Sequence, residues 1–87
     1  MIIASAIKYH IDTTDSDVIL CGRRHSDIIN QLKLLGFKPH IGYKELEQGF
    51  IDNRGVFMNR YEAYLHAVSL QQIKKKKEEL LYSEDLW

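Results

Sequence analysis

The sequence predicts one small α+β domain, in which two hairpins form an antiparallel sheet that packs with two helices. Two observations favour this class: turn-forming residues separate short apolar segments typical of strands, and the apolar spacing changes twice to a helical period. A chain of 87 residues buries only roughly 60–65% of its unfolded surface, so its core is thin. We therefore expect a single domain over residues 1–87 that gains stability as a homo-oligomer.

The first hairpin is predicted at the start of the chain. Ile2 to Ile11 is rich in β-branched and aromatic residues with partial alternation, which is typical of a strand. A polar cluster at residues 12–17 forms a turn. A second apolar run at residues 18–21 ends at Gly22, so the two segments read as a pair of strands.

The first helix is predicted to begin near Ser26, where the apolar period changes. Ser26 or Asp27 can cap its start, and Gly36 can end it. Residues 37–47 contain the only proline and are predicted to be irregular, with at most a short strand at residues 41–43. The helical stripe consists of Ile28, Ile29, Leu32 and Leu35.

The second hairpin and the second helix follow one another directly. Residues 50–52 and 56–58 flank a turn whose Gly55 can supply a positive φ. Asn59 followed by Glu62 resembles a capping box, and a helical stripe continues through Ala63, Ala67, Leu70 and Ile73. Residues 78–87 end with apolar side chains, which favours a docking tail on this subunit or on a neighbour.

Charge and cysteine content argue against several classes of protein. Twelve basic and twelve acidic side chains give a formal net charge of zero, so we expect no polymeric nucleic acid as partner. The single Cys21 cannot form an internal disulfide, and no metal site or cofactor is expected, because no His or Cys pair has ligand spacing. No apolar run approaches the ~18 residues of a membrane helix, so we expect no membrane partner and a cytoplasmic location.

Arg23, Arg24 and His25 form the first candidate site. They lie between a predicted strand and the start of a helix, where free backbone N–H groups and the helix dipole favour an anion. Two guanidinium groups add paired donors that match phosphate oxygens. The alternative is a solvated basic loop in which His25 packs or caps, and the residues alone give the two about even odds.

Residues 48–60 form a second candidate surface. Phe50 and Phe57 are candidate platforms for base stacking, the Asn59 amide can contact a base edge, and Arg60 can contact phosphate. The opposing interpretation is strong, since phenylalanines in a hairpin are core residues about twice as often as ligand contacts. Helix capping alone also explains Asn59.

An enzyme is not expected. The sequence contains no nucleophile-elbow or zinc-protease motif and no paired carboxylates. Glu62 and His66 are four residues apart on one helical face and could form an acid–base pair, but a surface salt link or an interface contact is the favoured role.

Several short motifs occur in a fixed order over nearly the whole chain. They are Gly22-Arg23-Arg24-His25, Gln48-Gly49-Phe50, Asn59-Arg60-Tyr61-Glu62-Ala63, Gln72-Ile73 and Ser83-Glu84-Asp85-Leu86-Trp87. Taken together, these motifs resemble small phage proteins of the Thoeris anti-defence family, first type. The resemblance implies a non-enzymatic sponge that binds cyclic ADP-ribose isomers made by bacterial TIR-domain immune enzymes, and in some members cyclic oligonucleotides, so that the host immune effector is not activated.

The resemblance also implies an assembly and a set of ligand contacts. It implies homo-oligomers, including hexamers built from dimers, that act in the bacterial host cytoplasm during infection. It places phosphate and ribose contacts on Arg23, Arg24 and His25, base stacking on Phe50, and polar contacts on Asn59 and Arg60. Two alternatives stay open: a small nucleic-acid-binding phage regulator and, less favoured, a cyclic-nucleotide phosphodiesterase.

Overall fold

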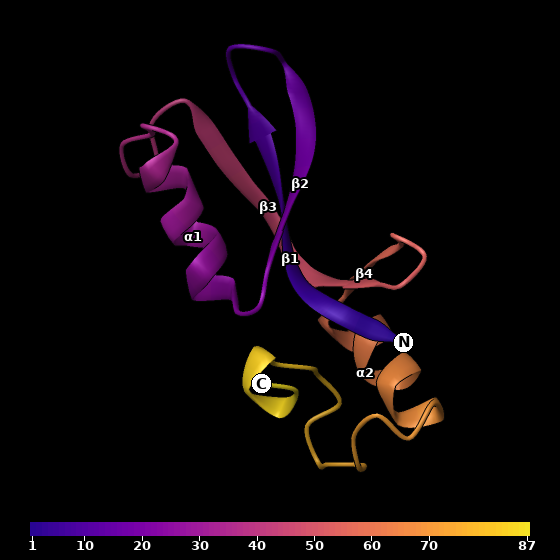
Figure 1. Ribbon diagram of the computed structural model, residues 1–87. Helices are drawn as coiled ribbons and strands as arrows, with labels where there is room; N and C mark the ends of the chain where they lie inside the picture. Colours follow the sequence, from indigo (N-terminus) through magenta and orange to yellow (C-terminus); the bar gives the residue numbers. More distant parts are fainter.

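A four-stranded antiparallel sheet with strand order β2-β1-β3-β4 runs through the molecule (Figure 1). The structure is a computed structural model that describes residues 1–87. It confirms the predicted α+β class, with two hairpins and two helices. The elements are β1 (Ile2–Ile11), β2 (Ser16–Gly22), α1 (His25–Leu34), β3 (Tyr43–Asp52), β4 (Phe57–Asn59), α2 (Arg60–Ser69) and the short 3-10 helix η1 (Ser83–Asp85).

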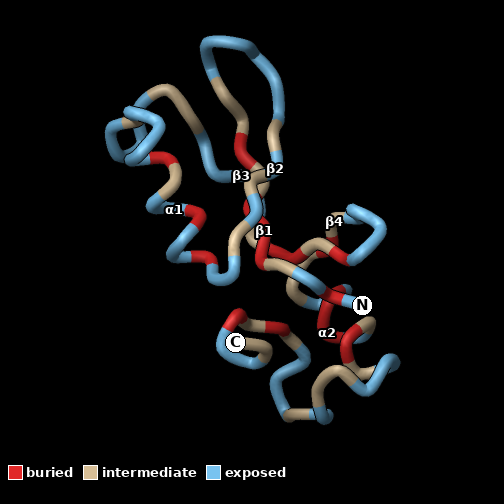
Figure 2. Tube along the Cα trace, viewed as in Figure 1, coloured by how far each residue is buried: buried red, intermediate tan, exposed pale blue.

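The two helices pack near opposite ends of the long central strands β1 and β3, which gives the molecule an elongated shape of 40 × 21 × 20 Å (Figure 1). The buried residues accordingly form two groups (Figure 2). The α1 cluster consists of Ile7, Tyr9, Ile28 and Leu32. The α2 cluster consists of Ile2, Phe50, Met58, Ala63, Tyr64, Ala67 and Leu81.

Helix α1 begins one residue earlier than predicted, and its cap is different. Arg24 is the N-cap residue, and the Asp27 carboxylate reaches back to accept a hydrogen bond from the Arg24 backbone N–H at 3.1 Å. Asp27 therefore closes the first turn from inside the helix rather than preceding it. The predicted end is confirmed, because Gly36 follows the C-cap residue Leu35 with a φ of 94°.

The prediction of an irregular segment up to residue 47 is wrong from Tyr43 onward. Residues 43–47 pair with the second half of β1, so β3 is ten residues long. Three of these residues, Lys44, Glu45 and Glu47, are charged and exposed, so the segment lacks the apolar alternation by which a strand is recognised in a sequence. The segment adopts a strand conformation because it pairs with β1, and not because of its local propensity.

Helix α2 is shorter than its predicted stripe. It ends at Ser69, Leu70 is its C-cap residue, and Gln71 adopts a φ of 58° that turns the chain away. Ala63 and Ala67 are buried as the stripe predicts, whereas Leu70 is 53% exposed. No helix in the structure combines the length and apolar content needed to cross a membrane.

The C-terminal segment, residues 70–87, returns along α2 and packs on the chain's own core. The Leu81 side chain is fully buried, and its backbone N–H donates to the carbonyl oxygen of Arg60 at 3.0 Å. Leu86 and Trp87 pack against the α2 cluster. In Figure 1 the colour of this segment changes from orange to yellow, and its yellow end lies beside α2 and below the start of α1.

Gly49 lets β4 approach β3 closely, and this generates a test of the fold. A Cβ atom at position 49 would lie 2.0 Å from the Met58 carbonyl oxygen and 2.8 Å from the Phe57 ring. We expect Gly49→Ala to lower the free energy of unfolding by about 3 kcal/mol, the upper end for overpacking, in urea denaturation. Gly22→Ala is the matched control, because its Cβ would meet only side chains at 3.1 Å or more. Equal losses for the two variants would contradict this account.

Candidate functional site

The six residues predicted to bind a ligand lie in different environments. His25 and Phe50 are buried, Asn59 and Arg60 are partly buried, and Arg23 and Arg24 are exposed. Four of them contact the C-terminal segment or a residue that does, so the segment decides which groups remain open to a ligand. The residues are Arg23, Arg24, His25, Phe50, Asn59 and Arg60.

His25 joins three parts of the chain. Its Nε2 lies 2.8 Å from the carbonyl oxygen of Gly49, which can only accept, so the neutral ring carries its proton on Nε2. Nδ1 then accepts from the Ser83 hydroxyl at 2.6 Å. Ser5 Oγ lies 2.7 Å from Ser83 Oγ and 3.0 Å from the Arg23 carbonyl oxygen. The start of α1, strand β3 and the C-terminal segment therefore meet at one imidazole.

The environment of His25 favours its neutral form. Burial is the largest effect and lowers the pKa of the ring, and the positive charge of Arg60 lowers it further. The Gly49 hydrogen bond and the carboxylates of Glu84 and Glu45 act in the opposite direction without reversing the shift. With both ring nitrogens already bonded and the ring only 9% exposed, His25 is a structural residue rather than a phosphate ligand.

The predicted stacking role of Phe50 is contradicted by its burial. The ring is fully buried in the α2 cluster and meets the His25 ring edge to face, with centroids 5.1 Å apart at 84°. A base cannot reach either face of this ring without opening the core. The core interpretation, favoured for each phenylalanine, holds for Phe50.

Arg60 holds the C-terminal segment. Its Nη1 donates to the Leu81 carbonyl oxygen at 2.9 Å, and its Nη2 donates to Gln48 Oε1 at 2.5 Å. The guanidinium also lies over the Tyr82 ring, 4.9 Å from the centroid. Its predicted contact with a ligand phosphate competes with these bonds, so Arg60→Ala removes support for the tail as well as a cation.

Asn59 is engaged in capping α2. Its side chain accepts from the Glu62 backbone N–H at 2.8 Å, and the Glu62 carboxylate accepts from the Asn59 backbone N–H at 3.0 Å. This is the predicted capping box. The candidate acid–base pair is divided, because Glu62 is used in the cap while His66 Nε2 lies 3.1 Å from the N-terminal amino group.

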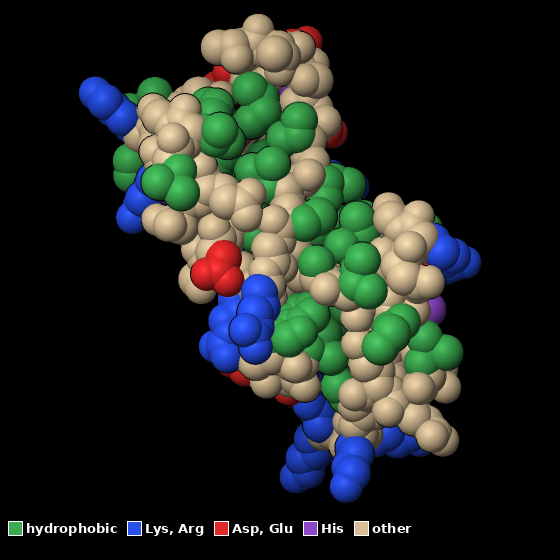
Figure 3. Space-filling view, viewed as in Figure 1, with side chains coloured by type: hydrophobic (Ala, Val, Ile, Leu, Met, Phe, Trp, Pro, Cys, Tyr) green, Lys and Arg blue, Asp and Glu red, His purple; other side chains and the backbone are tan.

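Arg23 and Arg24 are the predicted ligand residues that remain exposed. Neither takes part in any of the four ion pairs of the structure. One guanidinium nitrogen of Arg24 donates to the backbone oxygen of Trp87. The rest of both guanidinium groups faces solvent at the start of α1, and Figure 3 shows basic side chains beside a hydrophobic area at this place.

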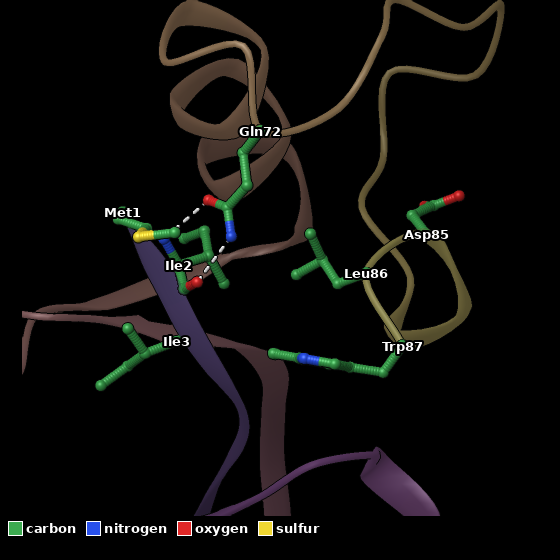
Figure 4. A pocket seen from close by; sticks show the side chains of 7 residues that line it. All are labelled: Met1, Ile2, Ile3, Gln72, Asp85, Leu86 and Trp87. Carbon is green, nitrogen blue, oxygen red and sulfur yellow. Dashed lines mark hydrogen bonds between the residues drawn. The ribbon is translucent and has the colours of Figure 1, made fainter.

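An open hollow of about 350 Å³ lies between the first residues of β1 and the end of the chain (Figure 4), and one of its lining residues, Trp87, is the acceptor for Arg24. The Gln72 amide closes one side by accepting from the Ile2 backbone N–H at 2.9 Å and donating to its carbonyl oxygen at 2.7 Å. Leu86 and Trp87 reach toward β1 from the opposite side. The lining residues are Met1, Ile2, Ile3, Gln72, Asp85, Leu86 and Trp87.

The sequence predicted a docking role for Trp87 and gave no indication that this residue lines a hollow. Its indole ring lines the hollow, and its backbone oxygen accepts from Arg24. An aromatic ring can stack with a base, and a nearby guanidinium group can bind a phosphate. The sequence does contain an aromatic residue at position 87 and a basic loop at Arg24. Because the two are 63 residues apart, nothing in the sequence indicated that they are in contact.

Comparison with known proteins gives one match. A family model described as "Phage T4 y16D protein" matches residues 1–87. No curated protein and no solved structure matches the chain. The family description names a phage and states no activity, so the function has to be argued from the residues.

The capping role of Asn59 can be tested by substitution. We expect Asn59→Ala to lower the free energy of unfolding by about 1 kcal/mol, because the Glu62 N–H loses its acceptor, and Asn59→Asp to retain most of the stability. Thermal unfolding of both variants measures this. If Asn59→Ala is as stable as the parent, the capping role is wrong.

The shifted pKa of His25 predicts how stability depends on pH. Folding lowers the pKa of His25 from its ordinary value of 6.5. As the pH falls below 6.5, the His25 ring therefore takes up a proton in the unfolded state before it does so in the folded state, and this lowers the free energy of unfolding. We expect His25→Gln, which cannot titrate, to be less stable at pH 7.5 but to lose less stability between pH 7.5 and 5. Denaturation at several pH values measures the two slopes, and parallel slopes would contradict the neutral buried ring.

Proposed function

The chain belongs to the phage T4 y16D protein family, and we propose that it is a phage anti-defence sponge that binds and sequesters a cyclic nucleotide immune signal. The proposed ligands are cyclic ADP-ribose isomers and cyclic oligonucleotides. The protein would act in the host cytoplasm during infection and would block activation of the immune effector by holding the signal without cleaving it.

The observation that carries this proposal is the exposed pair Arg23 and Arg24 at the start of α1, of which Arg24 donates to the backbone oxygen of Trp87, a residue that lines the hollow. A chain of zero net charge offers little long-range attraction to a polymer, whereas two local arginines suit a small anion. A cyclic ADP-ribose isomer carries a pyrophosphate and an adenine ring. The arginines complement the pyrophosphate, and the indole of Trp87 complements the adenine ring.

Stacking therefore moves from Phe50 to Trp87 in the proposed site. Base stacking on an aromatic side chain is worth on the order of 1–3 kcal/mol, which is enough to matter for a small ligand. Trp87 is partly exposed, unlike Phe50. Arg23 and Arg24 keep their predicted phosphate role, and His25 supports them by fixing the start of α1.

Binding without cleavage agrees with how the candidate acid–base groups are used. Both ring nitrogens of His25 are hydrogen-bonded inside the protein. Glu62 is engaged in the α2 cap, and His66 contacts the N-terminal amino group. None of these groups faces the hollow as a free acid or base.

Self-association is the second part of the proposal. Large apolar side chains are exposed at the end of α1, with Leu34 at 80% and Leu35 at 66%. A neighbouring subunit that covers them removes apolar surface from water and adds stability to a thin core. We propose a dimer-based homo-oligomer whose interface includes Leu34 and Leu35.

Calorimetric titration with cyclic ADP-ribose isomers tests the site. We expect Arg23→Gln and Trp87→Leu each to weaken binding by at least about tenfold, since each removes one charge-assisted or stacking contact. Arg54→Gln is the matched control, because that arginine is also exposed but pairs with Asp52 instead of facing the hollow. Ligand released by heating should be recovered unchanged.

Three outcomes would overturn the proposal. The parent could fail to bind any cyclic ADP-ribose isomer or cyclic oligonucleotide. The released ligand could be converted, which would indicate a phosphodiesterase. The protein could instead retard duplex DNA with an affinity that falls steeply with salt, which would indicate the nucleic-acid-binding regulator.

A further inference from the structure

A second cavity system lies at the other end of the sheet, between α1 and the start of β3. It consists of spaces of about 260 Å³ and about 110 Å³ that share Ile29, Leu32, His40 and Tyr43. Lys33 lines only the larger space, and Glu45 lines only the smaller one. These residues belong to neither the α2 cluster nor the hollow at Trp87, so the cavity is separate from the site proposed above.

Two aromatic rings line this cavity. The rings of His40 and Tyr43 are inclined by 28°, with centroids 6.5 Å apart, so they form a stacked pair. His40 is exposed and lies in a loop. An exposed aromatic ring at the mouth of a cavity is a surface on which a planar guest can stack.

The chain holds both rings in place. Tyr9 and Phe37 meet the Tyr43 ring at 84° and 87°, each with centroids 5.6 Å away, and this fixes the plane of the Tyr43 ring. The Tyr43 hydroxyl accepts from the His40 backbone N–H at 3.3 Å. His40 itself has a φ of 59°, an uncommon value for a residue other than glycine. The loop therefore keeps the His40 ring near Tyr43.

Charge is distributed unequally along the cavity. Lys33 is exposed and forms none of the ion pairs in the structure, so its ammonium group is free to meet an anion. One Glu45 carboxylate oxygen accepts from Gln48 at 3.0 Å, which leaves the other oxygen as an acceptor at the smaller space. Burial, followed by the nearby Glu45 and Tyr43, raises the pKa of Tyr9 to about 12, so its hydroxyl stays a donor.

We propose that this cavity binds an adenine nucleotide, with the base stacked on the aromatic rings of His40 and Tyr43, its amino group toward Glu45 and its phosphate toward Lys33. An amino group is the complement of a carboxylate oxygen, and a phosphate is the complement of an ammonium group. A purine that lacks this amino group leaves the Glu45 oxygen without a donor and is disfavoured. The site thus selects amino-bearing bases.

Adenosine monophosphate is the probe that tests this site on the full chain. Titration followed by NMR should move the His40 ring protons upfield, because they come to lie over a base. Purine riboside 5′-monophosphate, which carries hydrogen in place of the amino group, should bind at least about tenfold more weakly. Ribose 5-phosphate should leave the His40 protons unmoved.

Variants separate this site from the sponge site. We expect His40→Ala and Lys33→Gln to weaken binding of adenosine monophosphate by at least about tenfold. His10→Ala and Lys77→Gln, which alter a histidine and a lysine outside the cavity, should bind like the parent. Trp87→Leu should also keep this binding, even if it abolishes binding of cyclic ADP-ribose isomers.

The proposal is overturned if millimolar adenosine monophosphate leaves the His40 protons unmoved, if purine riboside 5′-monophosphate binds equally well, or if His40→Ala binds like the parent. Loss of binding in Trp87→Leu but not in His40→Ala would place the nucleotide in the hollow at Trp87 instead. That result would leave the proposed sponge function standing while removing the second site.

Discussion

The hydrogen bonds of His25 join parts of the chain that are far apart in sequence. The ring nitrogen Nδ1 lies 2.6 Å from a Ser83 hydroxyl that is 58 residues away, and Nε2 lies 2.8 Å from the Gly49 carbonyl oxygen. Because the ring is buried, losing either partner leaves a polar atom without a hydrogen bond inside the protein, which is costly. This joint fixes the position of the C-terminal segment against β3 and the start of α1.

The proposed ligand site depends on that placement. The segment supplies Leu81 to the α2 cluster and Trp87 to the hollow, and Arg24 and Arg60 both donate to its backbone oxygens. Core packing and the proposed ligand site therefore depend on the same segment at this end of the sheet. The opposite end, around Tyr43, is packed separately in the smaller α1 cluster, and an open cavity remains there.

Local signals predicted the elements that depend on local physics. The bounds of β1 follow from its β-branched and aromatic side chains, and the start of α2 follows from a cap whose partners are three residues apart. The first half of β3 was missed because its stability comes from pairing with β1. The candidate site was predicted only in part: an apolar pattern does not distinguish a core ring such as Phe50 from a partly exposed ring such as Trp87. Arg60 looked free because its partner Leu81 lies 21 residues away.

Trp87 is the only tryptophan, so its fluorescence reports directly on the hollow that carries the proposed function. Titration of the full chain with cyclic ADP-ribose isomers should quench and shift this emission to saturation, because the adenine ring covers the indole. The same titration of Arg23→Gln should require a much higher ligand concentration. Emission that stays constant while calorimetry detects binding would show that the ligand binds elsewhere and would contradict the account.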